Sequence, residues 1–195
     1  MRAFGPSALV TPANGVTMAR VAITPVLLAA VAGSGASYLV LALWIALASS
    51  DGLDGYLARR HGTTRSGAFL DPLADKLLVL GAMVALAGRG VFAWFPVSLI
   101  AFREVAMSIY RSWVGRRGVS IPARRSAKAK TVVQEVSVGL ALFPPVARRA
   151  PGLARIALWV AVVLTLSTGV QYLLDGAAAR RDRAGGADDK DASAR

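Results

Sequence analysis

The sequence predicts an all-α protein embedded in a membrane, organised as a bundle of six transmembrane helices with both termini in the cytoplasm. Of its 195 residues, 55% are hydrophobic, and the mean hydropathy is +0.52, so the chain is more apolar than an ordinary soluble domain. Apolar segments long enough to cross a bilayer alternate with short polar loops. Basic residues gather in alternate loops, a pattern typical of a membrane protein with a fixed orientation.

Six apolar segments each come near the ~20 residues needed to cross ~30 Å of hydrocarbon. They cover residues 16–32, 37–60, 67–88, 95–114, 131–147 and 153–174. Because the loops between them are short, consecutive helices are expected to pack as antiparallel neighbours. The first segment has no clear small-residue cleavage site, so it is interpreted as a spanning helix rather than a signal peptide.

Basic residues predict the orientation of this bundle. The loops after the second and fourth segments and the stretch after the sixth contain Arg59, Arg60, Arg65, Arg116, Arg117, Arg124, Arg125, Lys128, Lys130, Arg180, Arg181 and Arg183. The opposite loops contain Arg89, Arg148, Arg149 and Arg155. Since cytoplasmic loops carry the excess of Lys and Arg, both termini and the turn after the second segment are expected in the cytoplasm.

Residues 1–175 are predicted to form one six-helix domain. Residues 176–195 mix charges with Ala and Gly and have no apolar face, so they are expected to form a disordered cytoplasmic tail. The net charge of +12 is spread over short clusters between apolar runs, which suits membrane loops and argues against a nucleic-acid-binding surface. The absence of cysteine excludes disulfides, thiolate metal sites and cysteine nucleophiles.

Two pairs of aspartates interrupt the second and third apolar segments. The first pair is Asp51 and Asp54, and the second is Asp71 and Asp75. A carboxylate at membrane depth is costly and marks a functional site by default. A second helix that ended at Ser50 would have about fourteen residues, too few to span a bilayer, so the helix is expected to continue through the first pair.

The spacing of the aspartates predicts that the two pairs face each other. Asp51 and Asp54 are i and i+3, and Asp71 and Asp75 are i and i+4, so each pair shares one helix face. With a turn near residues 62–63, the pairs lie roughly 14 Å and roughly 16 Å from it at 1.5 Å per residue. Converging carboxylates need cations to stay ionised. Oxygen ligands favour Mg²⁺, with Mn²⁺ able to substitute. Two such ions would neutralise the four carboxylates, an arrangement suited to phosphoryl transfer.

Small residues and one arginine accompany the aspartates. Gly52, Gly55, Ala58 and Gly67 leave space for a ligand, or for close packing of the facing helix. Arg59 could bind a phosphate through its guanidinium group, or serve only as a topology charge.

The run Asp51-x-x-Asp54-Gly55-x-x-Ala58-Arg59, seven residues, then Gly67-x-x-x-Asp71-x-x-x-Asp75 resembles the signature of the CDP-alcohol phosphotransferases. Members of this family transfer the phosphatidyl group of a donor, usually CDP-diacylglycerol, to an alcohol and release CMP. The resemblance implies that the four aspartates hold the metal ions and that Asp75 is also the general base. It further implies that Asp54, Gly55, Ala58, Arg59 and Gly67 contact the cytidine diphosphate, and that the protein is a homodimer.

Further stretches resemble one branch of that family. The runs FLDPLADKLL, REVAMSIYRSWV and KAKT are similar to the bacterial phosphatidylglycerophosphate synthases, whose acceptor is sn-glycerol 3-phosphate. Asn14, Thr17 and Arg20 also resemble that branch, in which this segment helps to hold the donor nucleotide. Arg20 could instead extend its charge to the membrane surface.

Basic residues in the second half could bind the phosphate of the acceptor. Arg103 and Arg111 lie near one face of the fourth segment, and Glu104 cannot neutralise both. Since arginines within a membrane need partners, an anionic acceptor could supply one, with help from Lys128 and Lys130. Alternatively, Arg103 pairs with Glu104 or with an aspartate of the first half, and the lysines act only as topology charges.

The expected protein is therefore a multi-pass enzyme of the bacterial plasma membrane with its active site facing the cytoplasm. Its partners would be CDP-diacylglycerol, sn-glycerol 3-phosphate and membrane lipids, and no nucleic acid. Two other acceptors remain possible, namely inositol phosphate and, as in a cardiolipin synthase, phosphatidylglycerol. A divalent-cation transporter is another possibility, although the chain lacks the inverted repeats often seen in transporters. A purely structural network of aspartates and arginines is a third.

Overall fold

The computed structural model describes residues 12–61, 65–116 and 125–193, and the side chains of residues 14–50, 72–110, 112–113 and 129–174. This part of the chain is helical apart from short turns and contains no strand. Its helices are α1 (Pro12–Gly33), α2 (Tyr38–His61), α3 (Arg65–Gly88), α4 (Trp94–Arg116), α5 (Arg125–Leu142), α6 (Pro144–Arg149) and α7 (Pro151–Ser193). The all-α prediction is confirmed.

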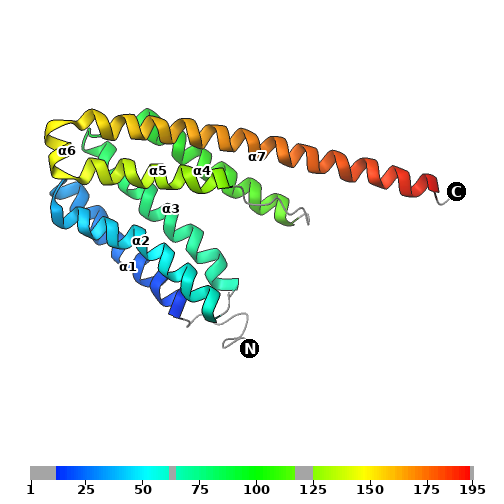
Figure 1. The fold of residues 1–195 in the computed structure, drawn as a ribbon, viewed down its shortest axis with the longest axis horizontal. Helices are drawn as coiled ribbons and strands as arrows, with labels where there is room; N and C mark the ends of the chain where they lie inside the picture. The colour runs from blue at the N-terminus through cyan, green and yellow to red at the C-terminus, as the bar shows by residue number, and fades with distance from the viewer. Residues whose placement is uncertain (1–11, 62–64, 117–124, 194–195) are drawn as a thin grey trace.

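The helices form two groups that meet at one end of the molecule (Figure 1). Helix α1 packs against α2 and α3, whereas α7 packs against α5 and α4. The groups converge near α6 and diverge towards the opposite end, where α2 ends and α3 begins (Figure 1). Contacts of α3 with α4 and α5, and of α2 with α5, connect the groups.

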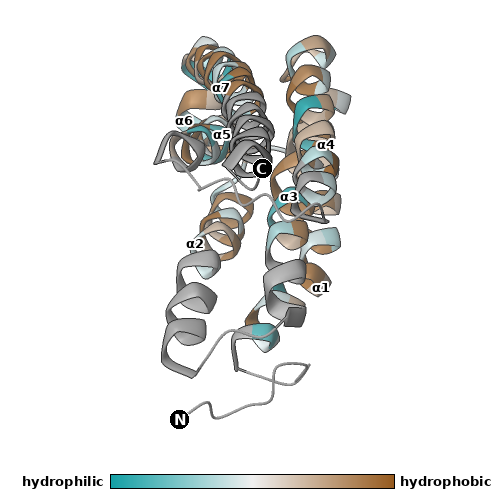
Figure 2. Ribbon diagram, turned by 90° about the vertical axis from the view of Figure 1, so that its right-hand side faces the viewer, coloured by the Kyte–Doolittle hydropathy of each residue, from teal (hydrophilic) through white to brown (hydrophobic). Residues whose placement is uncertain are grey.

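Large apolar side chains lie on the outside of the bundle as well as in its core. The core includes Leu78, Met83 and Leu158, all at most 1% exposed. On the outside, Leu39 is 81% exposed and Phe102 is 76% exposed. Figure 2 shows that hydrophobic residues occur along much of the length of the described helices. Such a surface suits lipid better than water.

Two of the helices, over Asn14–Gly33 and Pro151–Leu174, are long and apolar enough to span a membrane, and a shorter apolar helix covers Tyr38–Ser50. Tyr38–Ser50 is the first part of α2 rather than a separate helix. This result concerns the described side chains and rests on length and composition. It supports an apolar helical bundle. The predicted six spans and the cytoplasmic position of both termini stay predictions.

Helix α2 continues past Ser50 to His61, as the length argument requires. Helix α3 begins at Arg65, so Pro72 lies inside it rather than at its first turn. A proline within a helix removes one backbone hydrogen bond and loosens the helix locally. The backbones at both aspartate pairs are therefore helical, as predicted.

The fifth predicted segment, 131–147, is wrong at both ends. Helix α5 starts at Arg125 and stops at Leu142, and α6 forms a separate short helix from Pro144. Phe143 has an extended backbone with φ −77° and ψ 112°, the conformation favoured before proline. Proline at the first position of α6 then starts the new helix. Hydropathy alone misses this break because apolar residues continue through it.

Helix α7 also differs from the expected boundary at residue 175, since its backbone is helical to Ser193. It extends beyond the rest of the bundle (Figure 1). Alanine and arginine have high helix propensity, which favours helix even where no apolar face is available. The prediction of a disordered tail rested on the mixture of charges with Ala and Gly as well as on the missing apolar face, and it stays a prediction.

Candidate active site

A cavity of about 210 Å³ lies between the two helix groups, bounded by α3, α4 and α5. It is large enough for several water molecules, each of which occupies about 30 Å³ in the liquid. Its lining comprises Pro72, Asp75, Lys76, Val79, Leu80, Arg103, Glu104, Met107, Ser108, Lys130, Thr131 and Gln134. The predicted base Asp75 and the predicted phosphate ligands Arg103 and Lys130 thus line the same cavity, although they come from three helices.

Asp75 forms an ion pair with Arg20 of α1. The Nη1 atom of Arg20 donates to Oδ1 of Asp75 at 2.9 Å, and its Nε donates to Oγ of Ser50 on α2 at 2.9 Å. The Arg20 side chain is 0% exposed, whereas that of Asp75 is 31% exposed. Arg20 therefore connects all three helices of the first group and holds one oxygen of a carboxylate that is still accessible from the cavity.

Asn14 and Thr17 are buried on the same helix as Arg20, at intervals of three residues. Residues at this spacing lie along one helix face. The Oγ1 atom of Thr24 donates to the carbonyl of Arg20 at 2.7 Å, so the polar row continues one turn further into the bundle. The alternative that Arg20 extends to the membrane surface is wrong, because its charge is directed inwards.

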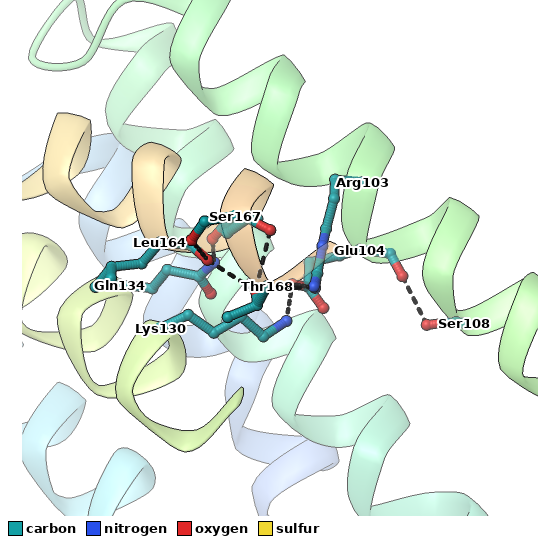
Figure 3. Close-up of polar contacts among 9 residues, drawn as sticks. Arg103, Glu104, Ser108, Lys130, Gln134, Leu164, Ser167 and Thr168 are labelled. Atoms are coloured by element: carbon teal, nitrogen blue, oxygen red, sulfur yellow. Dashed lines mark hydrogen bonds and ion pairs between the residues drawn. The ribbon is translucent and has the colours of Figure 1, made fainter. Parts of the chain in front are cut away.

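Glu104 connects two cations on the other side of the cavity. Its Oε1 accepts a hydrogen bond from Nη1 of Arg103 at 2.9 Å and forms an ion pair with Nζ of Lys130 (Figure 3). Glu104 and Lys130 are buried. The alternative in which Arg103 pairs with Glu104 is thus observed. The pairing leaves Arg103 and Lys130 sharing one carboxylate.

Helix α7 fixes the other edge of the Arg103 side chain. The Nη2 atom donates to Oγ1 of Thr168 at 3.0 Å. The Nε atom is buried without a hydrogen-bond partner and lies so close to Gly169 that a Cβ built there would be 3.0 Å from it. Nearby, Nε2 of Gln134 donates to Oγ1 of Thr165 at 2.9 Å, joining α5 to α7. Arg103 is therefore held in a defined position beside the cavity.

The charges around the cavity favour an anionic ligand. Lys76, Arg103 and Lys130 contribute positive charge, and Asp75 and Glu104 contribute negative charge. Since Asp75 already pairs with buried Arg20, the face formed by α4 and α5 has an excess of positive charge. Arginine and lysine side chains in such a setting bind phosphate oxygens through charge-assisted hydrogen bonds.

The family model for CDP-alcohol phosphatidyltransferases matches residues 10–167, which include every helix that surrounds the cavity. The chain belongs to the CDP-alcohol phosphatidyltransferase family. Three bacterial relatives cover most of it. A "Probable phosphatidylglycerophosphate synthase" of Mycobacterium tuberculosis is 38% identical over 167 residues, which cover 83% of this chain and 79% of the relative.

Two relatives are named "CDP-diacylglycerol--glycerol-3-phosphate 3-phosphatidyltransferase". The protein of Pectobacterium atrosepticum is 37% identical over 137 residues, covering 67% of this chain and 74% of its own length. The protein of Rickettsia felis is 32% identical over 168 residues, covering 82% of this chain and 91% of its own length.

Several predicted site residues of this CDP-alcohol phosphatidyltransferase lie outside the described side chains. They are Asp51, Asp54, Gly55, Ala58, Arg59, Gly67, Asp71, Arg111 and Lys128. Among the side chains that the structure describes, no three His, Cys, Asp or Glu residues form a metal-binding group. Three of the four predicted metal ligands are not among these side chains, so the metal site stays a prediction.

Sequence reasoning missed three residues that line the cavity of this phosphatidyltransferase or contact a residue of its lining. Glu104 was considered only as a partner for its neighbour, whereas it also binds Lys130, 26 positions away. Lys76 and Thr168 were not considered. The charge of Lys76, one position after an aspartate of the signature, could have indicated its proximity to the site. Thr168 has no comparable signal, because its role depends on packing between α4 and α7.

Proposed function

We propose that this phosphatidyltransferase transfers the phosphatidyl group of CDP-diacylglycerol to sn-glycerol 3-phosphate, yielding phosphatidylglycerophosphate and CMP. The names of the bacterial relatives support this donor and acceptor. The observation that carries the proposal is the shared cavity, in which an accessible carboxylate, Asp75, faces the cationic pair Arg103 and Lys130. An acceptor that has both a hydroxyl and a phosphate fits these two ends.

At one end of the cavity, Asp75 is the general base. It accepts the proton of the attacking hydroxyl, whose oxygen forms a bond to the phosphorus that bears diacylglycerol, and the bond from that phosphorus to CMP breaks. Arg20 holds Oδ1 of Asp75 and so orients the carboxylate. A positioned base of this kind contributes typically ~10²–10⁴ to the rate.

At the other end, Arg103 and Lys130 bind the phosphate of the acceptor, with Lys76 nearby. Without an acceptor, their charge is balanced only in part by Glu104. The acceptor phosphate would share the donors that Glu104 now occupies. Arg111 and Lys128, proposed from the sequence, would extend this basic face.

The four aspartates of α2 and α3 would hold two Mg²⁺ ions, with Mn²⁺ as a substitute. The fit rests on the chemistry of the donors and on the helical backbone that carries them, with Asp51 and Asp54 on α2 and Asp71 and Asp75 on α3. When bound, such ions offset the charge of a diphosphate and stabilise the leaving nucleotide. Asn14, Thr17, Gly55, Ala58, Arg59 and Gly67 would contact the cytidine diphosphate.

The enzyme would be a six-span protein of the bacterial plasma membrane with both termini and the active site at the cytoplasmic side. The positive loops support this orientation. The donor lipid would enter sideways from the cytoplasmic leaflet, with its head group at the α2–α3 hairpin. The family resemblance further suggests a homodimer.

The test is CMP release from CDP-diacylglycerol by the purified protein with Mg²⁺, with sn-glycerol 3-phosphate and inositol phosphate supplied in parallel. Turnover with glycerol 3-phosphate alone, lost in Asp75→Asn, is the expected result. Inositol phosphate is the second candidate acceptor, because the basic face would also accept its phosphate. Turnover with inositol phosphate alone would overturn the acceptor and keep the reaction class. Metal uptake into proteoliposomes without CMP release would favour a transporter.

A further inference from the structure

A second cavity, of about 380 Å³, lies where the α1–α2 turn, the α3–α4 turn and the start of α7 meet. We call it the turn cavity. Its lining includes Gly35, Arg89, Gly90, Val91, Pro151 and Arg155. These turns stand at the end of the bundle where α6 lies (Figure 1), opposite the hairpin that carries the aspartates.

Arg89 is fixed in the turn cavity by the end of α1. Its Nη1 donates to the carbonyls of Ala32 and Gly33 at 2.6 and 2.9 Å. Its guanidinium lies directly against Gly35, where a Cβ would be 2.7 Å from Nη2, and Gly35 has φ +68°. Glycine is thus required here both for the turn and for the position of the arginine.

Arg155 approaches the turn cavity from the first turns of α7. Its Nε donates to the carbonyl of Val91 at 3.2 Å. Arg148 and Arg149 lie in the last turn of α6, just before α7 begins. Among the described side chains, no carboxylate forms an ion pair with any of these four arginines. Arg89 and Arg155 therefore bring positive charge to the lining of the turn cavity without a carboxylate partner among the described side chains, while Arg148 and Arg149 lie outside that lining.

The orientation rule does not account for these arginines, because they lie on the side that should carry few positive charges. A structural role also accounts for only some of their donors, since Arg89 uses Nη1 and Arg155 uses Nε for backbone carbonyls. The N-terminus of α7 at Pro151 adds the positive end of a helix dipole. Two guanidinium groups beside such a helix end suit a ligand with several anionic oxygens.

We propose that the turn cavity binds a phosphate group, and that its source is the head group of an anionic phospholipid. This inference rests on the proposed membrane orientation, which puts the turn cavity at the head-group level of the leaflet opposite the active site. Free phosphate has the same chemistry and is the other source that the experiment must distinguish. The bound group would stabilise the junction of three turns without taking part in catalysis.

The test measures thermal unfolding of the purified full chain in neutral detergent by tryptophan fluorescence. The added probes are phosphatidylglycerol, phosphatidylcholine and inorganic phosphate, each over a concentration series. Phosphatidylglycerol should raise the unfolding temperature more than phosphatidylcholine does. Arg155→Gln should weaken the apparent affinity for phosphatidylglycerol about tenfold, whereas Arg149→Gln, a matched change of an exposed arginine that does not line the cavity, should retain most of it.

If phosphatidylglycerol raised the unfolding temperature equally in the wild type and in Arg155→Gln, the proposed site would be overturned. An equal rise of the wild-type unfolding temperature with phosphatidylcholine and phosphatidylglycerol would also overturn it. A response to inorganic phosphate that depends on Arg155 would keep the site and identify free phosphate as a source. If Arg155→Gln fails to fold, Arg155→Lys replaces it in the test. This variant keeps the positive charge but loses the paired donors of the guanidinium group, so its affinity for phosphatidylglycerol should be intermediate. CMP release by the wild type tests the proposed function separately, and Arg155→Gln should leave it unchanged.

Discussion

The two helix groups use buried charge in opposite ways. In the first group, α1 to α3, four signature residues are aspartates, and one buried arginine, Arg20, holds the accessible Asp75. In the second group, α4, α5 and α7, one buried carboxylate, Glu104, holds the cations Arg103 and Lys130. The first group thus carries the carboxylates that are proposed to hold metal ions, and the second carries the cations that are proposed to bind a phosphate.

In the proposed function, this difference between the two groups would let one cavity distinguish the hydroxyl end of the acceptor from its phosphate end. A buried counter-ion fixes the geometry of the functional groups at each end without cancelling all of their charge. Isolated buried charges would be strongly unfavourable, so each group needs its counter-ion even before a substrate binds. Substitutions of Asp75 and Arg20 probe the carboxylate end, and substitutions of Arg103 and Gly169 probe the cationic end.

The largest expected effect is on the reaction rate at the carboxylate end. Asp75→Asn should lower the rate of CMP release by about 10²–10⁴-fold, because the base is lost. The asparagine oxygen can still accept the hydrogen bond from Arg20, so the protein should remain folded. Rates of CMP release and thermal unfolding curves check both statements. An equal loss of activity and of folded protein would instead support the purely structural role of the aspartates.

A second prediction concerns the buried counter-ion of the same end. Arg20→Met should lower the free energy of unfolding by about 3 kcal/mol, since removal of one partner of a buried pair leaves the other uncompensated. This value is at the lower end of the usual cost of breaking a buried ion pair, because Asp75 keeps part of its hydration. Denaturant titration in mild detergent measures the free energy of unfolding. Val21→Ala, a change at an exposed neighbour on α1, is the control and should change stability far less.

A third prediction concerns the cationic end. Arg103→Gln should raise KM for glycerol 3-phosphate by about 10–100-fold, the range expected when a hydrogen bond to a charged group is lost. The change in kcat should be small, because Arg103 takes no part in the proposed proton transfer. It is proposed to bind the phosphate of the acceptor, which does not react. Steady-state kinetics at saturating donor provide the measurement. A fall in kcat at constant KM would contradict the assignment.

The smallest predicted effect concerns the way in which α7 positions Arg103. Gly169→Ala should raise KM for the acceptor a few-fold, since the added Cβ would stand 3.0 Å from Nε of Arg103 and displace it. Gly152→Ala on the same helix is the matched control, because a Cβ there meets nothing within 4 Å. Equal KM values for the two variants would show that the position of Arg103 does not depend on Gly169.

The sequence predicts the elements of this bundle better than it predicts the contacts between them. The length needed for a span correctly extends α2 through Asp51 and Asp54, and the spacing of the signature leads to the family. The end of α5 was missed because hydropathy does not register the break at Pro144. Helix periodicity describes one helix at a time, so it cannot show that Lys130 of α5 would reach Glu104 of α4.

The contact of Arg20 with Asp75 illustrates the same limit. Both residues belong to stretches that resemble the family, yet they are 55 positions apart, and no local pattern links them. The predictions for Arg111, Lys128 and the remaining aspartates stay predictions, because their side chains lie outside the described part of the chain.

The burial of Arg20 also has a consequence for biogenesis. The helix that carries it is synthesised first, whereas its partner Asp75 follows 55 residues later. In the proposed membrane arrangement, α1 would therefore hold, during translation, an arginine that lipid alone accommodates poorly. Its stable integration must await α2, which supplies Ser50, and α3, which supplies the carboxylate. The first three helices should accordingly leave the insertion machinery as one assembled unit rather than one at a time.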